Sequence, residues 1–256
     1  MKQYKTRTYF FPLQFIYNMM VFCAVCFAGI STVQGQTQKL LAADFLYNRV
    51  NKLYRLDQNL VNGVKYYKSL EPVLGNEFFM DEKSLPGKIT VNNVTYDHIF
   101  LKYDLVNQNV ILDYDYPQGG RMQIIIDNDK ISKFEILDKT FIKYDFPATG
   151  KKFFQTIRTG QITCLVYYKK EMYPTESSLQ YVYRYSDEKR KFYLLRDGNL
   201  YQFTGQISFM KLFPGKRDEI RKYIRRYNLQ LRIISEKDLV KLLEFCNNIL
   251  QNNSGG

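Results

Sequence analysis

The chain of 256 residues has few side chains that could act as an acid, a base or a nucleophile. Its one histidine, His98, adjoins Asp97 in a predicted strand, and a G-x-S-x-G nucleophile elbow is absent. A Ser-His-Asp triad would therefore have to use His98 as its base. A zinc site needs three or four His, Cys or carboxylate ligands, which one histidine and distant cysteines do not suggest. The sequence predicts a surface imidazole at His98, no metal, no cofactor and no enzymatic activity.

Carboxylates are the other residues that could do chemistry, and a predicted hairpin gathers three of them on one face. Asp104, Asp113 and Asp115 could mimic a calcium site or the carboxyl pair of a glycosidase. However, Lys102 lies opposite Asp113 in the predicted pairing and would neutralise it, and no D-x-D-x-D-G loop is present. A hydrolase that depends on Asp104 or Asp113 is therefore an alternative that ranks behind a binding function.

Tyrosines supply the best candidate for ligand binding in a chain that has 22 Tyr and no Trp. Tyr181, Tyr183 and Tyr185 alternate along a predicted strand and share one face, and Arg184 lies beside them. Such a stripe could stack on sugars or line an amphipathic pocket. The alternative is that the stripe is the core side of the strand.

Basic residues gather on a predicted helix over residues 217–227, and Arg221, Lys222, Arg225 and Arg226 are its exposed candidates for contact with an anionic surface. The net charge of the chain is +12, which favours partners such as acidic glycans or phospholipid head groups. A solvated helix face explains the same residues equally well. Because we expect the protein to be exported, nucleic acid is not an expected partner.

The N-terminus predicts a signal peptide over residues 1–35, followed by a single domain over residues 36–256. An apolar run covers residues 15–30, and Val33 and Gly35 are small residues of the kind that signal peptidase needs. A run of about 16 apolar residues is shorter than the roughly 20 that span a bilayer, so we expect cleavage after Gly35 and no transmembrane span afterwards. The positive segment before the run is Lys2, Lys5 and Arg7.

Cleavage would leave two of the four cysteines, Cys164 in a predicted strand and Cys246 in a predicted helix. An exported protein could bridge them, but an isolated pair far apart in sequence is no disulfide framework. The sequence favours two buried free thiols.

The elements that must position these residues are organised around a hairpin over residues 94–116. With a turn at Asn107-Gln108, Leu105 faces Val110 and Tyr103 faces Leu112, so apolar and aromatic pairs share one face. In the same register Lys102 faces Asp113 on the other face. A slip of one residue would put the charges inside, which is why the pattern predicts this face for the core.

Shorter strands with turn signals flank this hairpin, and helices are predicted at both ends of the domain. Asn92-Asn93 and Asp197-Gly198-Asn199 are the clearest hairpin turns. A helix is expected over residues 38–56, and three near the C-terminus, with Ser208 and Ser235 as N-caps of two of them. The last helix should bury an apolar stripe made of Leu239, Leu242, Leu243, Cys246, Ile249 and Leu250. The predicted fold is α+β: an antiparallel meander curled into a half-barrel or barrel, with the N-terminal and C-terminal helices packed on it.

Several segments together resemble an uncharacterised family of exported, β-rich bacterial envelope proteins. In that family a helix leads into L-Y-N-G-x-x-Y, then G-x-x-F-F, then a strand run that ends in L-x-Y-D. Here Val61 stands where Tyr is common, and Asn93 where Gly is common. The resemblance covers residues 46–250 and is carried by Leu60-Val61-Asn62-Gly63-Val64-Lys65-Tyr66, Gly75 with Phe78-Phe79, Gly87-Lys88-Ile89-Thr90-Val91, and Tyr96 with Leu101, Tyr103 and Asp104.

This resemblance implies export and a β-rich fold, in the periplasm or at the outer membrane of a Gram-negative bacterium, and it supplies no functional residues. We therefore expect a non-catalytic envelope protein that binds a lipid, a glycan or a peptide in the concavity of its sheet. The alternative is a structural or interaction protein of the envelope, which would use a sheet edge or the basic helix to hold a protein partner.

Overall fold

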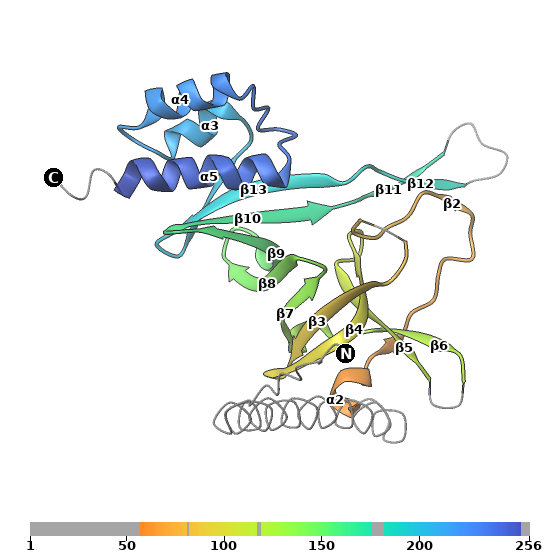
Figure 1. Ribbon diagram of the computed structural model, residues 1–256. Coiled ribbons are helices and arrows are strands. Elements are labelled where there is room, and N and C mark those ends of the chain that lie inside the picture. Colours follow the sequence, from red (N-terminus) through yellow and green to blue (C-terminus); the bar gives the residue numbers. More distant parts are fainter. Residues whose placement is uncertain (1–56, 81, 117–118, 176–181, 252–256) are drawn as a thin grey trace, which may run out of the picture. The chain divides into compact units, whose positions relative to one another are not determined.

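The computed structural model describes residues 57–80, 82–116, 119–175 and 182–251 (Figure 1). The chain divides into two units, Met1–Leu56 and Asp57–Gly256, and the described residues all belong to the second. The predicted signal peptide, the helix predicted over residues 38–56, and Tyr181 lie outside the described residues.

A large antiparallel sheet of eleven strands dominates this unit, which confirms the prediction of a β-rich α+β fold. Its two end strands, β1 and β14, do not pair with each other, so the sheet is open and closure into a barrel is not shown. In spatial order the strands are β1 (Val64–Lys65), β6 (Arg121–Ile125), β5 (Asn109–Asp115), β4 (Val94–Asp104), β3 (Leu85–Val91), β7 (Ile131–Ile136), β8 (Lys139–Phe146), β9 (Gly150–Thr159), β10 (Ile162–Lys169), β13 (Lys189–Arg196) and β14 (Asn199–Phe203).

Tight turns between neighbouring strands have the residues that their backbone geometry requires. Asn92 and Asn93 join β3 to β4 with φ of 49° and 66°, and Asp197 and Gly198 join β13 to β14 with φ of 50° and 74°. Both central residues of a type I′ turn need positive φ, which Asn, Asp and Gly tolerate best. The two hairpin turns predicted from sequence are therefore confirmed.

The central hairpin β4–β5 pairs in a register two residues away from the predicted one. Tyr103 faces Val110 and Leu101 faces Leu112, so the predicted pair of Lys102 with Asp113 is wrong. The difference arises at the turn, where Asp104 ends β4 and its Oδ1 accepts hydrogen bonds from the backbone N–H groups of residues 106 and 107, at 2.8 and 3.0 Å. A slip of two residues keeps every side chain on its predicted face. The core face is buried as predicted.

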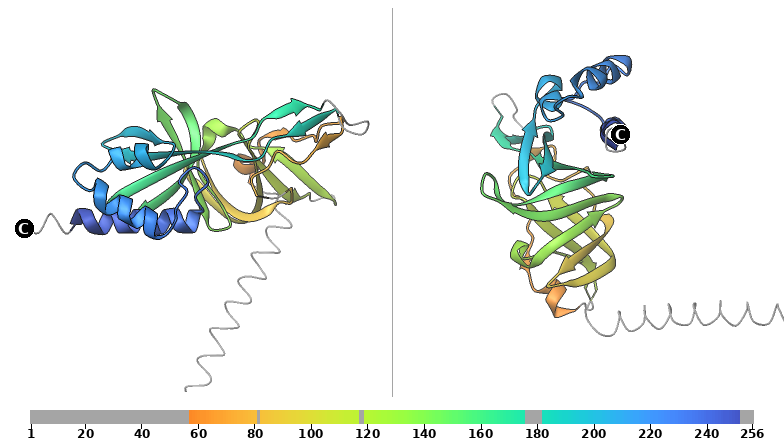
Figure 2. Two further views of the ribbon diagram at one scale, coloured as in Figure 1. Left: turned by 90° about the horizontal axis from the view of Figure 1, so that it is seen from above. Right: turned by 90° about the vertical axis from the view of Figure 1, so that its left-hand side faces the viewer.

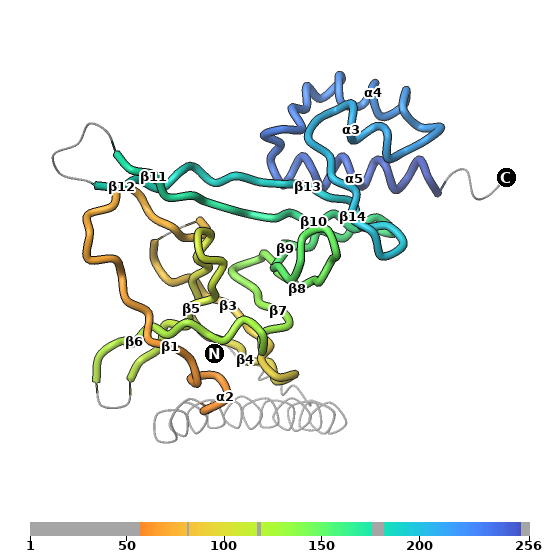
Figure 3. The backbone as a smooth tube through the Cα atoms, turned by 180° about the vertical axis from the view of Figure 1, so that it is seen from behind, coloured from red at the N-terminus to blue at the C-terminus, as the bar shows by residue number. Residues whose placement is uncertain are grey.

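A second, three-stranded sheet extends from the ends of β10 and β13. It contains β11 (Met172–Pro174) and β12 (Tyr183–Tyr185), which pair antiparallel, and β2 (Val73–Leu74), which runs parallel to β12. Figure 3 shows how the chain runs from the short helix α2 (Gln58–Val61) through β1, beside β6, to β2. One stretch of chain therefore contributes an edge strand to each sheet. A short 3-10 helix, η1 (Asn128–Lys130), precedes β7.

Three helices follow β14 and pack beside that end of the sheet (Figures 1 and 2): α3 (Gln206–Lys211), α4 (Arg217–Arg226) and α5 (Glu236–Gln251). The predicted cap of α5 is confirmed, since the Ser235 Oγ accepts from the Asp238 N–H at 3.1 Å. The predicted cap of α3 is wrong. Ser208 lies in the first turn of that helix, and its Oγ accepts from the Gly205 N–H at 3.1 Å instead.

Aromatic rings fill the space on the core face of the sheet. Phe134 and Phe141 stack at 4.7 Å between ring centroids, and Tyr103 meets both edge-on. On α5 the predicted apolar stripe is buried as expected. Cys164 and Cys246 are both buried and free, which confirms the predicted pair of thiols.

Candidate functional site

Polar and aromatic side chains meet on the face of β4, β5 and β6 that points away from the main core. Phe100, Asp113 and Gln123 are direct neighbours across these three strands, because Asp113 pairs with Phe100 on one side and with Gln123 on the other. Side chains directly opposite one another in an antiparallel ladder lie within reach of each other. Phe100 is 44% exposed, whereas Asp113 is 6% exposed.

Asp113 is the centre of this arrangement and is held by three side chains. Its Oδ1 accepts from the Arg121 Nε at 3.0 Å, and its Oδ2 accepts from the Ser84 Oγ at 2.5 Å and the Gln123 Nε2 at 3.0 Å. Since an ionised carboxylate can accept about four hydrogen bonds, the buried charge is well compensated. The Arg121 guanidinium also lies over the ring of Phe100, at 5.7 Å from the ring centroid.

Lys102 is the cation beside this cluster that lacks a close anionic partner. Its Nζ lies 4.5 Å from the centroid of the Phe78 ring, and among the described residues it forms no hydrogen bond or ion pair. Desolvation by burial lowers the pKa of Lys102, against the smaller opposing effect of Asp113. An ammonium group in this position would gain from an anionic or hydroxyl-rich ligand.

These residues border an open groove of about 420 Å³, which we call the Asp113 groove. Its floor is the row across β4, β5 and β6, and its rim comes from the residues that precede β3. It is lined by Glu82, Lys83, Ser84, Phe100, Lys102, Asp113, Arg121 and Gln123. The groove thus combines an exposed aromatic ring with carboxylate, amide, hydroxyl and cationic groups.

The tyrosine stripe predicted for ligand binding is placed only in part. Tyr183 and Tyr185 share one face of β12, half-buried, and Tyr181 lies outside the described residues. Desolvation and the neighbouring Glu77 raise the pKa of Tyr185 to about 12. Glu77 is itself buried and accepts a hydrogen bond from the Tyr66 hydroxyl at 2.5 Å. Tyr185 therefore contacts a buried carboxylate of the protein; ligand binding by the stripe stays a prediction.

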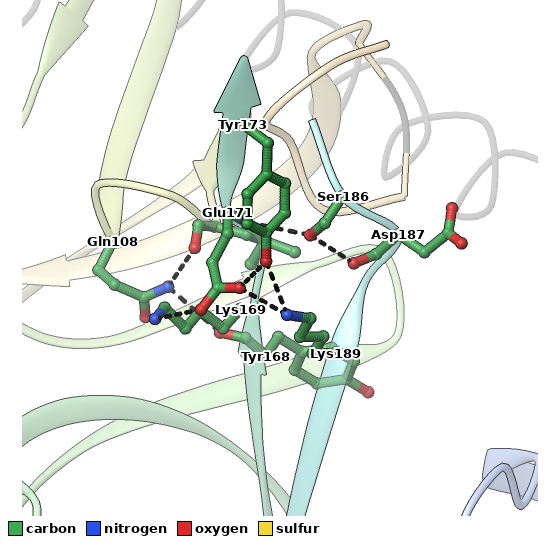
Figure 4. Close-up of polar contacts among 9 residues, drawn as sticks. Gln108, Tyr168, Lys169, Glu171, Tyr173, Ser186, Asp187 and Lys189 are labelled. Carbon is green, nitrogen blue, oxygen red and sulfur yellow. Dashed lines mark hydrogen bonds and ion pairs between the residues drawn. The ribbon is translucent and has the colours of Figure 1, made fainter. Parts of the chain in front are cut away.

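Arg184 lies on the opposite face of β12 and pairs across the ladder with Tyr173. Close by, Glu171 accepts from the Lys169 Nζ at 2.9 Å, from the Lys189 Nζ at 2.5 Å and from the Tyr173 hydroxyl (Figure 4). These bonds lower the pKa of Glu171 to about 2, with the one from Lys189 as the largest cause. The cluster joins β10 and β13 to the small sheet, so its role is structural.

The basic residues of α4 form a separate surface. Lys222, Arg225 and Arg226 are exposed, and the Arg221 guanidinium donates to Asp218 on the same helix at 2.7 Å. Figures 1 and 2 show α4 and β12 well apart, so these residues and the tyrosine stripe do not form one site. Contact of α4 with an anionic surface stays a prediction.

His98 and Asp104, the remaining candidates for catalysis, do not lie in one site. His98 has a φ of 56° and is exposed at an irregularity between β3 and β4. Asp104 is buried, and its carboxylate accepts hydrogen bonds from the backbone N–H groups of the turn that follows it. Over the described ranges, no group of three or more His, Cys, Asp or Glu could hold a metal ion.

Sequence reasoning named Asp113 and Lys102 but missed Ser84, Phe100 and Gln123. The cause was the predicted register of β4 and β5, which differs by two residues from the observed one. In the observed register Phe100 lies opposite Asp113. Nothing in the local sequence indicated that Ser84 would return to this face, because it reaches Asp113 from a loop 29 residues earlier.

Comparison of the chain with family models, curated proteins and solved structures found no match. Within the described part of the chain, no helix combines the length and the apolar character needed to cross a membrane.

Proposed function

We propose that this chain is an exported, non-catalytic binding protein of a bacterial cell envelope, and that the Asp113 groove holds an acidic glycan. The observation that carries the proposal is the row of Phe100, Asp113 and Gln123, which sets an aromatic ring beside a buried carboxylate and an amide. A sugar ring has an apolar face of C–H groups and an edge of hydroxyls that both donate and accept. Both kinds of surface have a counterpart in this row.

The acidic character of the ligand is inferred from the cations in the groove. Lys102 has no hydrogen-bonding partner among the described residues, and Arg121 uses only its Nε on Asp113, which leaves its terminal N–H groups for a ligand. A ligand carboxylate would accept from both. Cleavage removes Lys2, Lys5 and Arg7, and the mature chain keeps a net charge of +9, which also favours an anionic ligand over long distances.

This proposal moves the ligand away from the concave face of the sheet, where the sequence hypothesis put it. We infer that the sheet bends as a half-barrel. The support is that Tyr103 on β4 lies 6.3 Å from Phe153 on β9, although β3, β7 and β8 separate these strands. The N–H of Lys170 also donates to the Leu105 carbonyl at 3.1 Å, across the same bend. Tyr103, Phe134, Phe141 and Phe153 pack against one another in that bend, which favours a ligand site outside it.

Export rests on the N-terminal sequence, and the proposal includes cleavage after Gly35. The test is to express the full chain in a Gram-negative host and to sequence the N-terminus of the protein from the envelope fraction. A mature chain that starts at Gln36 is expected. Recovery of the intact N-terminus in the cytoplasmic fraction would contradict the export.

Binding is tested by calorimetric titration with two probes, tetragalacturonate and neutral maltotetraose. We expect the acidic probe to bind and the neutral one to bind about tenfold more weakly, the difference expected for about one charge-assisted hydrogen bond. Lys102→Met keeps the packing on the Phe78 ring but removes the charge, and should weaken the acidic probe selectively. Phe100→Ser should weaken both probes.

Lys133→Met is the control, because Lys133 is a half-buried lysine on β7 of the same sheet, paired with Glu135 and outside the groove. The glycan proposal fails if neither probe binds, or if Lys133→Met weakens binding as much as Lys102→Met. Shortening of the tetragalacturonate during the titration would contradict the non-catalytic part of the proposal and favour the hydrolase alternative.

A further inference from the structure

The start of α3 and the loop between α4 and α5 border a second groove, which we call the Ile207 groove. Its volume is about 590 Å³, and it lies at the β14 end of the sheet, among elements that do not line the Asp113 groove. Its lining residues are Thr204, Gly205, Gln206, Ile207, Ser208, Lys211, Leu229, Gln230, Leu231 and Arg232.

Apolar side chains are exposed at this groove. Ile207 is 72% exposed on its wall, and Ile233, directly after the lining residue Arg232, is 69% exposed. A single exposed isoleucine is ordinary, but two beside one groove mark a surface on which an apolar partner side chain would remove water from both.

The charge at the groove has one sign. Lys211 and Arg232 are its charged lining residues, and no lining residue is acidic. Both side chains are exposed, and within the described part of the chain neither forms an ion pair. The Arg232 Nε lies 3.9 Å from the position of a Cβ on Gly205, so the guanidinium stands over the start of α3. The groove therefore favours a partner with carboxylates.

Among the described strands, β14 has a neighbour on one side only, and its other edge leads into the groove. β14 is the last strand of the sheet, and its last residue, Phe203, directly precedes Thr204, the first lining residue. Edge strands have backbone N–H and C=O groups on their outer side that can pair with an added strand. An extended segment that pairs with β14 would continue along the wall that holds Ile207.

We propose that the Ile207 groove and the edge of β14 bind an extended acidic peptide segment of a partner protein. Charge complementarity selects this occupant, since carboxylates would meet Lys211 and Arg232 while an apolar side chain covers Ile207. A second copy of this chain fits less well, because two mature chains of net charge +9 repel each other. Alternation of acidic and apolar residues is the pattern that an added strand would present to the two parts of the groove.

The experiment uses fluorescence anisotropy with the mature chain and a labelled, end-blocked decapeptide of alternating Glu and Val. A decapeptide with Lys in place of Glu is the charge control. We expect the acidic peptide to bind and the basic one not to bind. The double variant with Lys211→Glu and Arg232→Glu should weaken binding about tenfold or more, and Ile207→Ser by a smaller factor of about five.

Lys222→Glu, on the exposed face of α4, is the control outside the groove and should keep the affinity within about twofold, because Lys222 does not line the groove and exposed charges are screened by salt. An equal loss in Lys222→Glu would overturn the proposal in favour of diffuse attraction by the basic surface. Absence of binding, or equal binding of the basic peptide, would overturn it as well. Sedimentation of the free chain completes the test: a dimer that the double variant abolishes would assign the groove to a second copy.

Discussion

At the scale of single residues, Asp113 does more than line a groove: its carboxylate ties the loop before β3 to β6. Ser84 comes from that loop, and Arg121 and Gln123 come from β6. Hydrogen bonds to a charged group contribute more than neutral ones, and a buried charge without partners is costly. The same geometry that could orient a ligand therefore also stabilises the fold.

Asp113→Asn should lower the free energy of unfolding by about 1–3 kcal/mol, since the amide cannot accept all three hydrogen bonds. Urea denaturation followed by circular dichroism measures the change. Asp115→Asn is the control, because Asp115 is exposed on the same strand, and its effect should stay within about 0.5 kcal/mol. Equal effects of the two substitutions would refute a structural role of Asp113.

The two thiols of the mature chain are a second prediction at this scale. Burial raises the pKa of Cys164 and of Cys246 to about 12, so both stay protonated at pH 8. Because the thiolate is the reactive form, neither should react with a disulfide reagent in the native protein, and both should react after unfolding in urea. Rapid release of one equivalent of chromophore from the native chain would contradict the burial.

At the scale of elements, the turns decide how the alternating strands are paired. The alternation of apolar and polar residues predicts which face of a strand is buried. It does not distinguish registers that differ by two residues, because such a slip leaves every side chain on the same face. The prediction for β4 and β5 was correct about Leu101, Tyr103, Val110 and Leu112, which are all buried, and wrong about their partners. The tight Asn92-Asn93 turn fixed its register because only two residues fit between the strands.

A substitution at Asn93, the second residue of this turn, should change the stability of the hairpin. Asn93 has a φ of 66°, which glycine adopts without strain and most other residues do not. Asn93→Gly should raise the free energy of unfolding by a few tenths of a kcal/mol, and Asn93→Ala should lower it by about 1 kcal/mol. Thermal unfolding of the pair measures both. A gain in Asn93→Ala would contradict the turn geometry.

At the scale of the whole molecule, sequence reasoning predicted the β-rich antiparallel fold, the buried cysteines and the apolar stripe of α5, because these follow from local periodicity. It could not predict the second sheet. That sheet depends on β2, two residues long, which pairs parallel to β12 from more than a hundred positions away. The Asp113 groove could not be predicted for the same reason, because Ser84 contacts Asp113 from 29 residues away in the sequence.

Lys169, Glu171 and Lys189 form the joint between the two sheets. Lys169 and Lys189 face each other as the last pair of β10 and β13, and like charges opposite one another destabilise a ladder. Glu171 binds both ammonium groups and thereby offsets this repulsion. Its pKa is about 2 in the folded chain, below its ordinary value near 4.5, so its contribution is complete above pH 4.5 and is lost as the pH falls towards 2.

Glu171→Gln should therefore be less stable than the parent chain at pH 7, and the difference should shrink steadily between pH 4.5 and pH 2. Urea unfolding at a series of pH values measures this difference. Asp187→Asn, at an exposed carboxylate beside the joint, controls for the general loss of a negative charge. A difference between Glu171→Gln and the parent that stays constant over this range would mean that the ion pairs do not hold the joint. At high salt the effect should diminish, because exposed ion pairs are screened.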